Sequence, residues 1–329
     1  MDPLTHISAG LAVSLFSRPW FQKAKYFIPF CLLAAWIPDA DIFFDGGDPE
    51  FSLLHHRGVT TSFIGGIPLA AAVAGLYKLV SKETKYLHAA LLAYVLICVH
   101  TWLDLVNTYG TQILAPLSNH RFALDGAFII DPILTLTGLI LIAVALIMKS
   151  KRRKVAFFAS LWFFAYPVMN MAIGGYLESA HSRKLTEQGV DHVAVYVAPD
   201  ALTPRYWKAI TDLGDQYRMD TIDLFGGEPV EPLFYQRASK DRMRLLGEQV
   251  SMFDTYAWFS RWPVVEETMT PEGLRVVFSD LRFTSNNPIM AAIFPEGRRP
   301  FVLEGLLSAD GTVLDWNFTP GASSRSGDD

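Results

Sequence analysis

The chain has 329 residues, of which 51% are hydrophobic, and a formal net charge of −5. This length allows two domains, and the acidic balance without a large basic surface excludes nucleic acid as an expected partner. The mean hydropathy is positive, and the apolar residues concentrate in the first 180 positions. We therefore expect a membrane part that contacts the lipid bilayer, followed by a water-soluble part.

Apolar segments in the first part predict an α-helical membrane bundle of about five to six helices in a domain spanning residues 1–180. The first two segments are short for a span and would be tilted or packed against their neighbours. The fourth is near the lower limit, and the remaining three are long enough for a hydrocarbon layer of about 30 Å. The six segments are 7–16, 26–37, 59–77, 87–103, 127–148 and 155–176.

Lysine and arginine residues between these segments fall into alternate loops. They gather at 18–25, 78–85 and 149–154, whereas the intervening loops carry carboxylates and two cations, Arg57 and Arg121. Loops rich in lysine and arginine usually face the cytoplasm. We therefore expect a multi-pass protein of the cell (inner or plasma) membrane, with the intervening loops and the C-terminal part outside the cytoplasm.

The C-terminal part predicts a smaller α+β soluble domain at 190–318, followed by a disordered tail at 319–329. The tail is rich in Gly, Ser and Asp, a composition that buries little apolar surface. Alternating apolar residues predict strands, and an Asp-Gly pair at 310–311 predicts a hairpin turn. No catalytic motif stands out in this part of the sequence. The expected elements are strands at 192–198, 273–283 and within 301–318, and a helix at 238–259.

Histidine and aspartate residues fall at the same ends of successive apolar segments in the membrane part. The threading of the chain would bring them together at one face of the bilayer, on the predicted extracytoplasmic side. Imidazoles and carboxylates gathered at a membrane surface are typical of metal sites. The candidate ligands are His6, Asp39, Asp41, His56, His100 and Asp104.

Two of these motifs have spacing that suits chelation. In residues 100–104, His-Thr-Trp-Leu-Asp, the histidine and the aspartate share one helix face and can reach one cation. The plainer alternative is a histidine at a helix end that is hydrogen-bonded to the aspartate. Residues 38–41, Pro-Asp-Ala-Asp, end an apolar run with two carboxylates, and a cation or Arg57 would relieve their repulsion. A solvated turn is the alternative there.

The loops add further polar groups. Residues 55–58, His-His-Arg-Gly, offer two imidazoles, a cation for an anionic substrate and a flexible glycine, although a His pair in a loop is often ordinary surface chemistry. Residues 107–111, Asn-Thr-Tyr-Gly-Thr, supply donors for a phosphate or an oxyanion, while a helix cap explains the glycine equally well. We place Asp125 and Asp131 around the ligands, and Asp131-Pro132 predicts a helix start.

Together these motifs resemble the membrane-bound metal-dependent hydrolases of the YdjM/YfhP type. The resemblance covers roughly the first 180 residues, and it implies a helical membrane domain that carries a metal-dependent hydrolase site. Such proteins usually have a histidine where this chain has Thr61, which leaves a ligand or a proton donor in question. The matching segments are an early His at 6, Pro-Asp-x-Asp at 38–41, His-Arg-Gly-x-Thr at 56–60, His-x-x-x-Asp at 100–104 and Tyr-Gly-Thr at 109–111.

We therefore predict a membrane-bound hydrolase that uses metal-activated water at the extracytoplasmic face. One or two divalent cations, with zinc favoured and manganese or iron as alternatives, would be the cofactor. His100, Asp104 and Arg57 would form the catalytic set, with Arg57 neutralising an anionic group of the substrate. A phosphoester or a lipid-derived ester fits an interfacial site.

Two other classes of function stay open. In one, the protein is a non-catalytic metal-binding membrane scaffold or a transporter. Transport predicts ionisable groups in the middle of the spans, and these segments are almost free of them. In the other, the soluble domain is a recognition module and the helical bundle is only its anchor.

Overall fold

The computed structural model describes residues 1–293 and 300–320, which form two compact units. Each unit is described by itself. The boundary lies inside a long helix, a few residues before the expected end of the first domain at residue 180. A short segment from the first part of the sequence also joins the second unit, which the sequence did not predict. Unit 1 comprises Met1–Phe44 and His55–Ile173, and unit 2 comprises Asp45–Leu54 and Gly174–Asp329.

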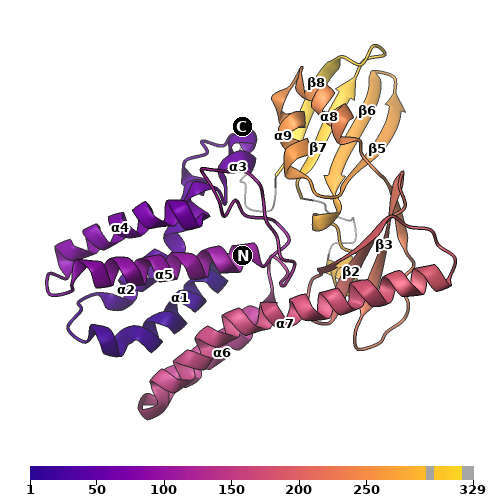
Figure 1. Cartoon of the computed structure of the whole chain (residues 1–329). Coiled ribbons are helices and arrows are strands. Elements are labelled where there is room, and N and C mark those ends of the chain that lie inside the picture. Colours follow the sequence, from indigo (N-terminus) through magenta and orange to yellow (C-terminus); the bar gives the residue numbers. More distant parts are fainter. Residues whose placement is uncertain (294–299, 321–329) are drawn as a thin grey trace. The chain divides into compact units, whose positions relative to one another are not determined.

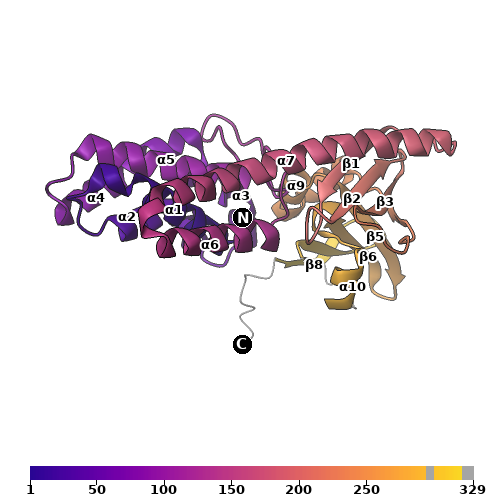
Figure 2. The ribbon, with the colours of Figure 1, turned by 90° about the horizontal axis from the view of Figure 1, so that it is seen from below.

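Unit 1 is a bundle of helices (Figures 1 and 2), so the helical bundle expected from the sequence is confirmed. The last part of α7 belongs to unit 2. Short 3-10 helices connect some of the α-helices, and two of them, η2 (Ile37–Phe43) and η3 (Val59–Thr61), carry residues of the candidate site. The long helices are α1 (Pro3–Ser17), α2 (Phe27–Trp36), α4 (Phe63–Val80), α5 (Tyr86–Leu105), α6 (Pro132–Ile147) and α7 (Arg152–Glu187).

The expectation of five to six spans was too high. Three segments of the described chain are long and apolar enough to cross a membrane: α4, α5 and Lys149–Glu187, which contains α7. The helix α6 is apolar but has only 16 residues, because it starts at Pro132 and is capped by the Asp131 side chain. The helices α1 and α2 have 15 and 10 residues, too few for a straight crossing.

Helix α5 holds unit 1 together because it belongs to both of its apolar clusters. Leu96 and Ile97 pack with residues of α2 and α4, whereas Leu103 packs with residues of α1, α6 and α7. A hydrogen bond also ties α5 to α7. Pro167 lacks an N–H group, so the carbonyl of Phe163 has no helical donor, and the Trp102 indole donates to it at 3.2 Å.

Helices α1 and α2 come unusually close at Gly10. A Cβ atom placed on Gly10 would lie 2.5 Å from the Cβ of Ala35, so only glycine permits this approach without movement of the helices. Gly10 lies one helical turn after His6, and Ala35 lies four residues before Asp39. The close approach therefore brings these two polar side chains to one place.

Unit 2 contains two antiparallel sheets of four strands each, in the orders β1-β2-β3-β4 and β5-β6-β7-β8. Short helices accompany them (Figure 1). The expected α+β domain is thus corrected to a mostly β domain. The strands are β1 (Ala194–Pro199), β2 (Tyr206–Asp212), β3 (Gln216–Asp223), β4 (Leu233–Gln236), β5 (Pro263–Thr270), β6 (Gly273–Asp280), β7 (Val302–Leu307) and β8 (Val313–Thr319). The helices are α3 (Pro49–His55), α8 (Lys240–Gly247), α9 (Ser251–Phe259) and α10 (Pro288–Ile293), with η5 (Leu281–Phe283) after β6.

The strands that the sequence predicted are present as β1, β6, β7 and β8, and the predicted helix at 238–259 forms as α8 and α9. Strand β2 was missed because all of its residues are buried, which removes the alternation that marks a half-buried strand. It even buries Lys208, whose Nζ donates to the backbone carbonyls of Leu281, Arg282 and Thr284. From residue 321 on, the predicted tail lies outside the described residues.

The segment Asp45–Leu54 is held within unit 2 by hydrogen bonds. The Glu50 carboxylate accepts from the hydroxyls of Ser251 and Thr255 at 2.7 and 2.8 Å. Both donors lie on the first turns of α9, where the helix dipole favours a negative charge. The link between the Asp39 and His56 motifs is therefore anchored in unit 2.

The close packing at Gly10 predicts opposite effects for two glycine substitutions. Gly10→Ala should lower the stability of the protein in detergent by about 1–3 kcal/mol through overpacking. Gly75→Ala, in the middle of α4 with nothing within 4 Å of its added Cβ, should raise it by up to about 1 kcal/mol through helix propensity. Thermal unfolding of both variants measures this. Equal stabilisation by the two substitutions would show that α1 and α2 do not meet at Gly10.

Candidate metal centre

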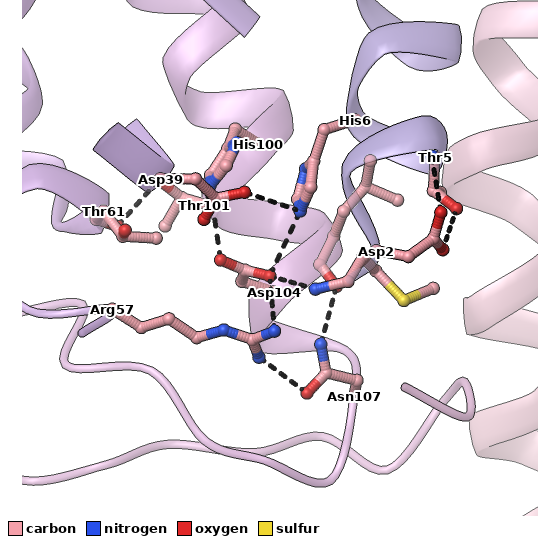
Figure 3. Close-up of polar contacts among 12 residues, drawn as sticks. Asp2, Thr5, His6, Asp39, Arg57, Thr61, His100, Thr101, Asp104 and Asn107 are labelled. Atoms are coloured by element: carbon pink, nitrogen blue, oxygen red, sulfur yellow. Dashed lines mark hydrogen bonds and ion pairs between the residues drawn. The ribbon is translucent and has the colours of Figure 1, made fainter. Parts of the chain in front are cut away.

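Four ionisable side chains converge inside unit 1. His6 comes from α1, Asp39 from η2, and His100 and Asp104 from consecutive turns of α5. One ligand atom from each lies within 4.8 Å of every other, and Figure 3 shows the side chains directed toward a shared space. The structure therefore brings together four of the six candidate ligands that the sequence pointed to.

The distances among these groups are short and similar. His6 Nε2 lies 3.3 Å from Asp104 Oδ1 and 4.0 Å from Asp39 Oδ2. His100 Nε2 lies 3.4 Å from Asp39 Oδ1 and 3.3 Å from Asp104 Oδ2. The two imidazole rings are stacked, with centroids 3.8 Å apart and planes 18° apart. Each ring thus presents its Nε2 atom to both carboxylates.

The backbone of α2 fixes the ring of His100. Nδ1 of His100 lies 2.8 Å from the carbonyl oxygen of Ala35, one of the last carbonyls of α2, which have no donor within the helix. A carbonyl only accepts, so Nδ1 carries a proton, and Nε2 is the nitrogen that would offer its lone pair to a metal when the ring is neutral. This arrangement is the one in which a histidine binds a metal while its other nitrogen donates to a backbone carbonyl.

The four side chains are almost completely removed from solvent. His6, His100 and Asp104 are at most 1% exposed, and Asp39 is 7% exposed. Within the described residues, both ring nitrogens of His6, Nε2 of His100 and Oδ2 of Asp104 have no hydrogen-bond partner. Buried polar atoms without partners are rare in proteins, and the two Nε2 atoms and Asp104 Oδ2 are atoms that a cation would use. The donor set therefore fits a divalent cation.

Electrostatics also favour charged carboxylates at this place. Burial alone would raise the pKa of the Asp39 carboxyl, but the neighbouring His100 ring overcomes this and holds that pKa below its usual value. Asp104 contacts two positive groups: the Arg57 guanidinium, at 3.2 Å from Oδ1, and the amino group of Met1. Acceptor oxygens are thus kept available beside the imidazoles.

Arg57 is held rigidly at the edge of the cluster. Its backbone is left-handed, with φ 58°, a conformation that costs energy for a residue other than glycine. The Arg57 N–H donates to Asp41 at 3.2 Å, and its carbonyl accepts from Gln112 at 2.9 Å. Nη1 donates to Asn107 at 2.9 Å (Figure 3). The strained turn therefore aims the guanidinium at Asp104.

Asp41 and His56, the other two candidate ligands, lie outside this cluster and pair with each other. Asp41 Oδ1 is 3.1 Å from His56 Nδ1. Its Oδ2 accepts from the backbone N–H of Arg57 and from the Thr60 hydroxyl, at 3.3 Å from the latter. Both carboxylate oxygens are therefore used within the loop that carries the His-Arg-Gly motif.

The remaining polar residues of the motifs take supporting places. Thr61, where the resemblance predicted a histidine, is fully buried, and its carbonyl accepts from the Thr101 hydroxyl at 2.8 Å. Asp125 and Asp131 lie outside the cluster. Asp131 caps α6 by accepting from the Leu134 N–H, and it accepts from the Tyr166 hydroxyl at 3.0 and 3.2 Å.

Two contacts near the site had only weak signals in the sequence. The carbonyl that accepts from His100 is a backbone group of Ala35, so the residue type at position 35 does not predict this contact. Arg121 was noticeable as a rare cation in its loop: it donates to the carbonyls of Gly110 and His56. The guanidinium groups of Arg57 and Arg121 lie 4.6 and 5.4 Å from the centroid of the Tyr109 ring. Both contacts are cation–π contacts.

Comparison with known proteins identifies the family of the chain. The sequence profile of the YdjM inner membrane protein family matches residues 1–177. The chain belongs to the YdjM family. It is also 24% identical over 323 residues to the uncharacterized protein YfhP of Bacillus subtilis (strain 168), a match that covers 92% of this chain and 90% of YfhP. No solved structure matches the chain. The YdjM match ends shortly after the boundary between the two units, so the family is defined by the part that contains the cluster.

The Asp131 cap predicts a pH-dependent effect on stability. Burial raises the pKa of the Asp131 carboxyl to about 6, above its value in an unfolded chain. The folded state therefore binds this proton more tightly than the unfolded chain does. The proton's contribution to the stability of the folded state is complete below about pH 4 and is lost by about pH 6. Asp131→Asn stays neutral and keeps a cap. The difference in unfolding free energy, variant minus wild type, should rise between these pH values by roughly 3 kcal/mol, as measured from the melting temperatures of the two proteins. A difference that is constant with pH would contradict this.

Proposed function

We propose that this protein is a membrane-bound metal-dependent hydrolase whose ligands are His6, Asp39, His100 and Asp104. Two imidazoles and two carboxylates, without a cysteine, suit zinc best and also suit manganese or iron. Because Asp41 and His56 pair with each other, the proposed centre holds one cation. The family, the helical bundle and the buried cluster support this proposal.

One observation carries the proposal: the spacing of the donor atoms. Donors at about 2.0–2.1 Å from a tetrahedral zinc ion lie about 3.3–3.4 Å from one another. Three of the four distances between an imidazole nitrogen and a carboxylate oxygen are 3.3–3.4 Å and the fourth is 4.0 Å, and the two oxygens of each carboxylate face different rings. A cation would therefore bind one oxygen of each carboxylate after a small rotation of the side chains.

The chemistry of such a centre follows from its neighbours. A divalent cation bound there would act as a Lewis acid and lower the pKa of a water molecule. Arg57, whose guanidinium touches Asp104 and Asn107, would neutralise the negative charge of a phosphoryl or carboxyl group on the substrate. We assign the attack on an ester to this place, with Arg57 orienting the reacting group.

The surroundings of Asp39 favour a substrate from the membrane interface. Asp39 has the highest solvent exposure of the four ligands, and it lies on η2. The same short element ends in exposed apolar side chains: Ile42 is 45% exposed, Phe43 68% and the following Phe44 78%. An apolar surface beside the opening of the site suits a lipid-derived ester or a phosphoester with an apolar part. We propose that this side of the bundle faces away from the cytoplasm, as the distribution of basic loops indicates.

The cluster predicts loss of metal in specific variants. Protein purified without chelators should contain close to one equivalent of zinc or a similar cation by elemental analysis. His100→Ala and Asp104→Ala should each lower this content by at least about tenfold, because each removes a ligand. The matched control is His120→Ala, an exposed histidine that lies outside the cluster and packs on Phe122. It should keep its metal.

Turnover then separates the classes of function. Wild-type protein with its metal should hydrolyse a 4-nitrophenyl phosphodiester or a 4-nitrophenyl carboxylic ester, and the two ligand variants should not. Wild-type protein without bound metal after incubation with zinc, manganese or iron would refute the proposal. Stoichiometric metal without hydrolysis of either ester would favour a metal-binding scaffold or a transporter.

A further inference from the structure

A second polar arrangement, the Asp41–His56 pair, lies beside the proposed metal centre. Asp41 Oδ1 contacts His56 Nδ1 at 3.1 Å, while Oδ2 accepts from the Arg57 N–H and the Thr60 hydroxyl. Three contacts therefore fix the carboxylate, and the carboxylate in turn fixes the ring. This is the geometry in which a carboxylate orients a histidine that transfers protons.

The contact with Asp41 determines which nitrogen of His56 is available. A carboxylate only accepts hydrogen bonds, so Nδ1 carries the hydrogen and Nε2 is the opposite, outward atom of the ring. Among the described residues, Nε2 of His56 has no hydrogen-bond partner, and the side chain is 22% exposed. A fixed ring with an accessible Nε2 can exchange a proton with a bound molecule.

Measured contacts connect His56 to the metal centre. Its ring lies edge-on to Tyr109, with centroids 6.0 Å apart. The Arg57 guanidinium covers that tyrosine at 4.6 Å and lies 3.2 Å from the ligand Asp104. Tyr109 therefore contacts both the His56 ring and the guanidinium that would hold an anionic substrate.

We propose that His56 is the proton-transferring catalytic residue of this hydrolase and that Asp41 is its positioning residue, acting on phosphoesters or carboxylic esters. The inference rests on the proposed function. The oxygen of water forms a bond to phosphorus or to the carbonyl carbon, and the bond to the leaving oxygen breaks, its electron pair staying on that oxygen. His56 starts as the imidazolium and gives its Nε2 proton to the leaving oxygen, while the attacking water loses a proton to solvent. The neutral Nε2 then regains a proton from solvent. Ester and water thus become acid and alcohol, with His56 unchanged.

The test compares two leaving groups. Zinc-loaded wild type, His56→Ala and Asp41→Asn are assayed with ethyl 4-nitrophenyl phosphate and ethyl phenyl phosphate, and with the corresponding butanoate esters. Phenolate needs a proton far more than 4-nitrophenolate does. His56→Ala should therefore lower kcat/KM for the phenyl ester by about 10²–10⁴-fold and affect the nitrophenyl ester much less. Asp41→Asn should show the same split, less strongly. The matched control His55→Ala, an exposed neighbouring histidine, should match the wild type.

Two further readouts separate proton transfer from a structural role. Elemental analysis should find the same metal content in His56→Ala, Asp41→Asn and wild type. Added imidazole should restore hydrolysis of the phenyl ester by His56→Ala and leave the wild type unchanged. Loss of metal from His56→Ala, an equal loss for both leaving groups, or full activity of the variant would overturn the inference and leave the proposed function intact. A wild type that binds no metal, or that hydrolyses neither ester, would overturn both.

Discussion

Two carboxyl groups and two imidazole rings occupy one buried space in unit 1, and the rest of the site depends on keeping them together there. Burying a charge without a partner is costly, and Arg57 and the amino group of Met1 offset this cost only at Asp104. A divalent cation would satisfy all four groups at once. The glycine contact between α1 and α2, the carbonyl that orients His100, and the place of α5 in both apolar clusters all maintain this arrangement.

The chain between the two aspartates of η2 and the His56 motif passes through unit 2. Its segment Asp45–Leu54 belongs to unit 2, where Glu50 is held by the first turns of α9. The residues on either side of this segment include Asp41 and His56, which pair with each other in unit 1. Removing unit 2 would therefore remove the packing partner of the segment that connects the two motifs.

The sequence predicted the helical bundle and four converging side chains, because residues at the same ends of successive helices must share a face. The sequence did not show that His56 and Asp41 lie outside the cluster of His100 and Asp104. A place at a helix end determines the side of the membrane, but it does not determine distances of a few ångströms between side chains. The spans were overcounted because Pro132 shortens α6. The β content was undercounted because a strand as buried as β2 has no alternating pattern. No feature of the sequence of residues 45–54 predicted that they belong to the same unit as the C-terminal part of the chain.

X-ray absorption at the zinc edge of the zinc-loaded protein tests the central claim most directly, because it reports the ligands without requiring a substrate. Four protein ligands and one water molecule predict a nitrogen and oxygen shell at about 2.0–2.2 Å, with the outer-shell scattering of two imidazole rings and no sulfur. Removing either His6 or His100 should reduce the imidazole signal or abolish binding. A shell with sulfur, with no imidazole, or unchanged in the two variants would place the cation elsewhere and contradict the account.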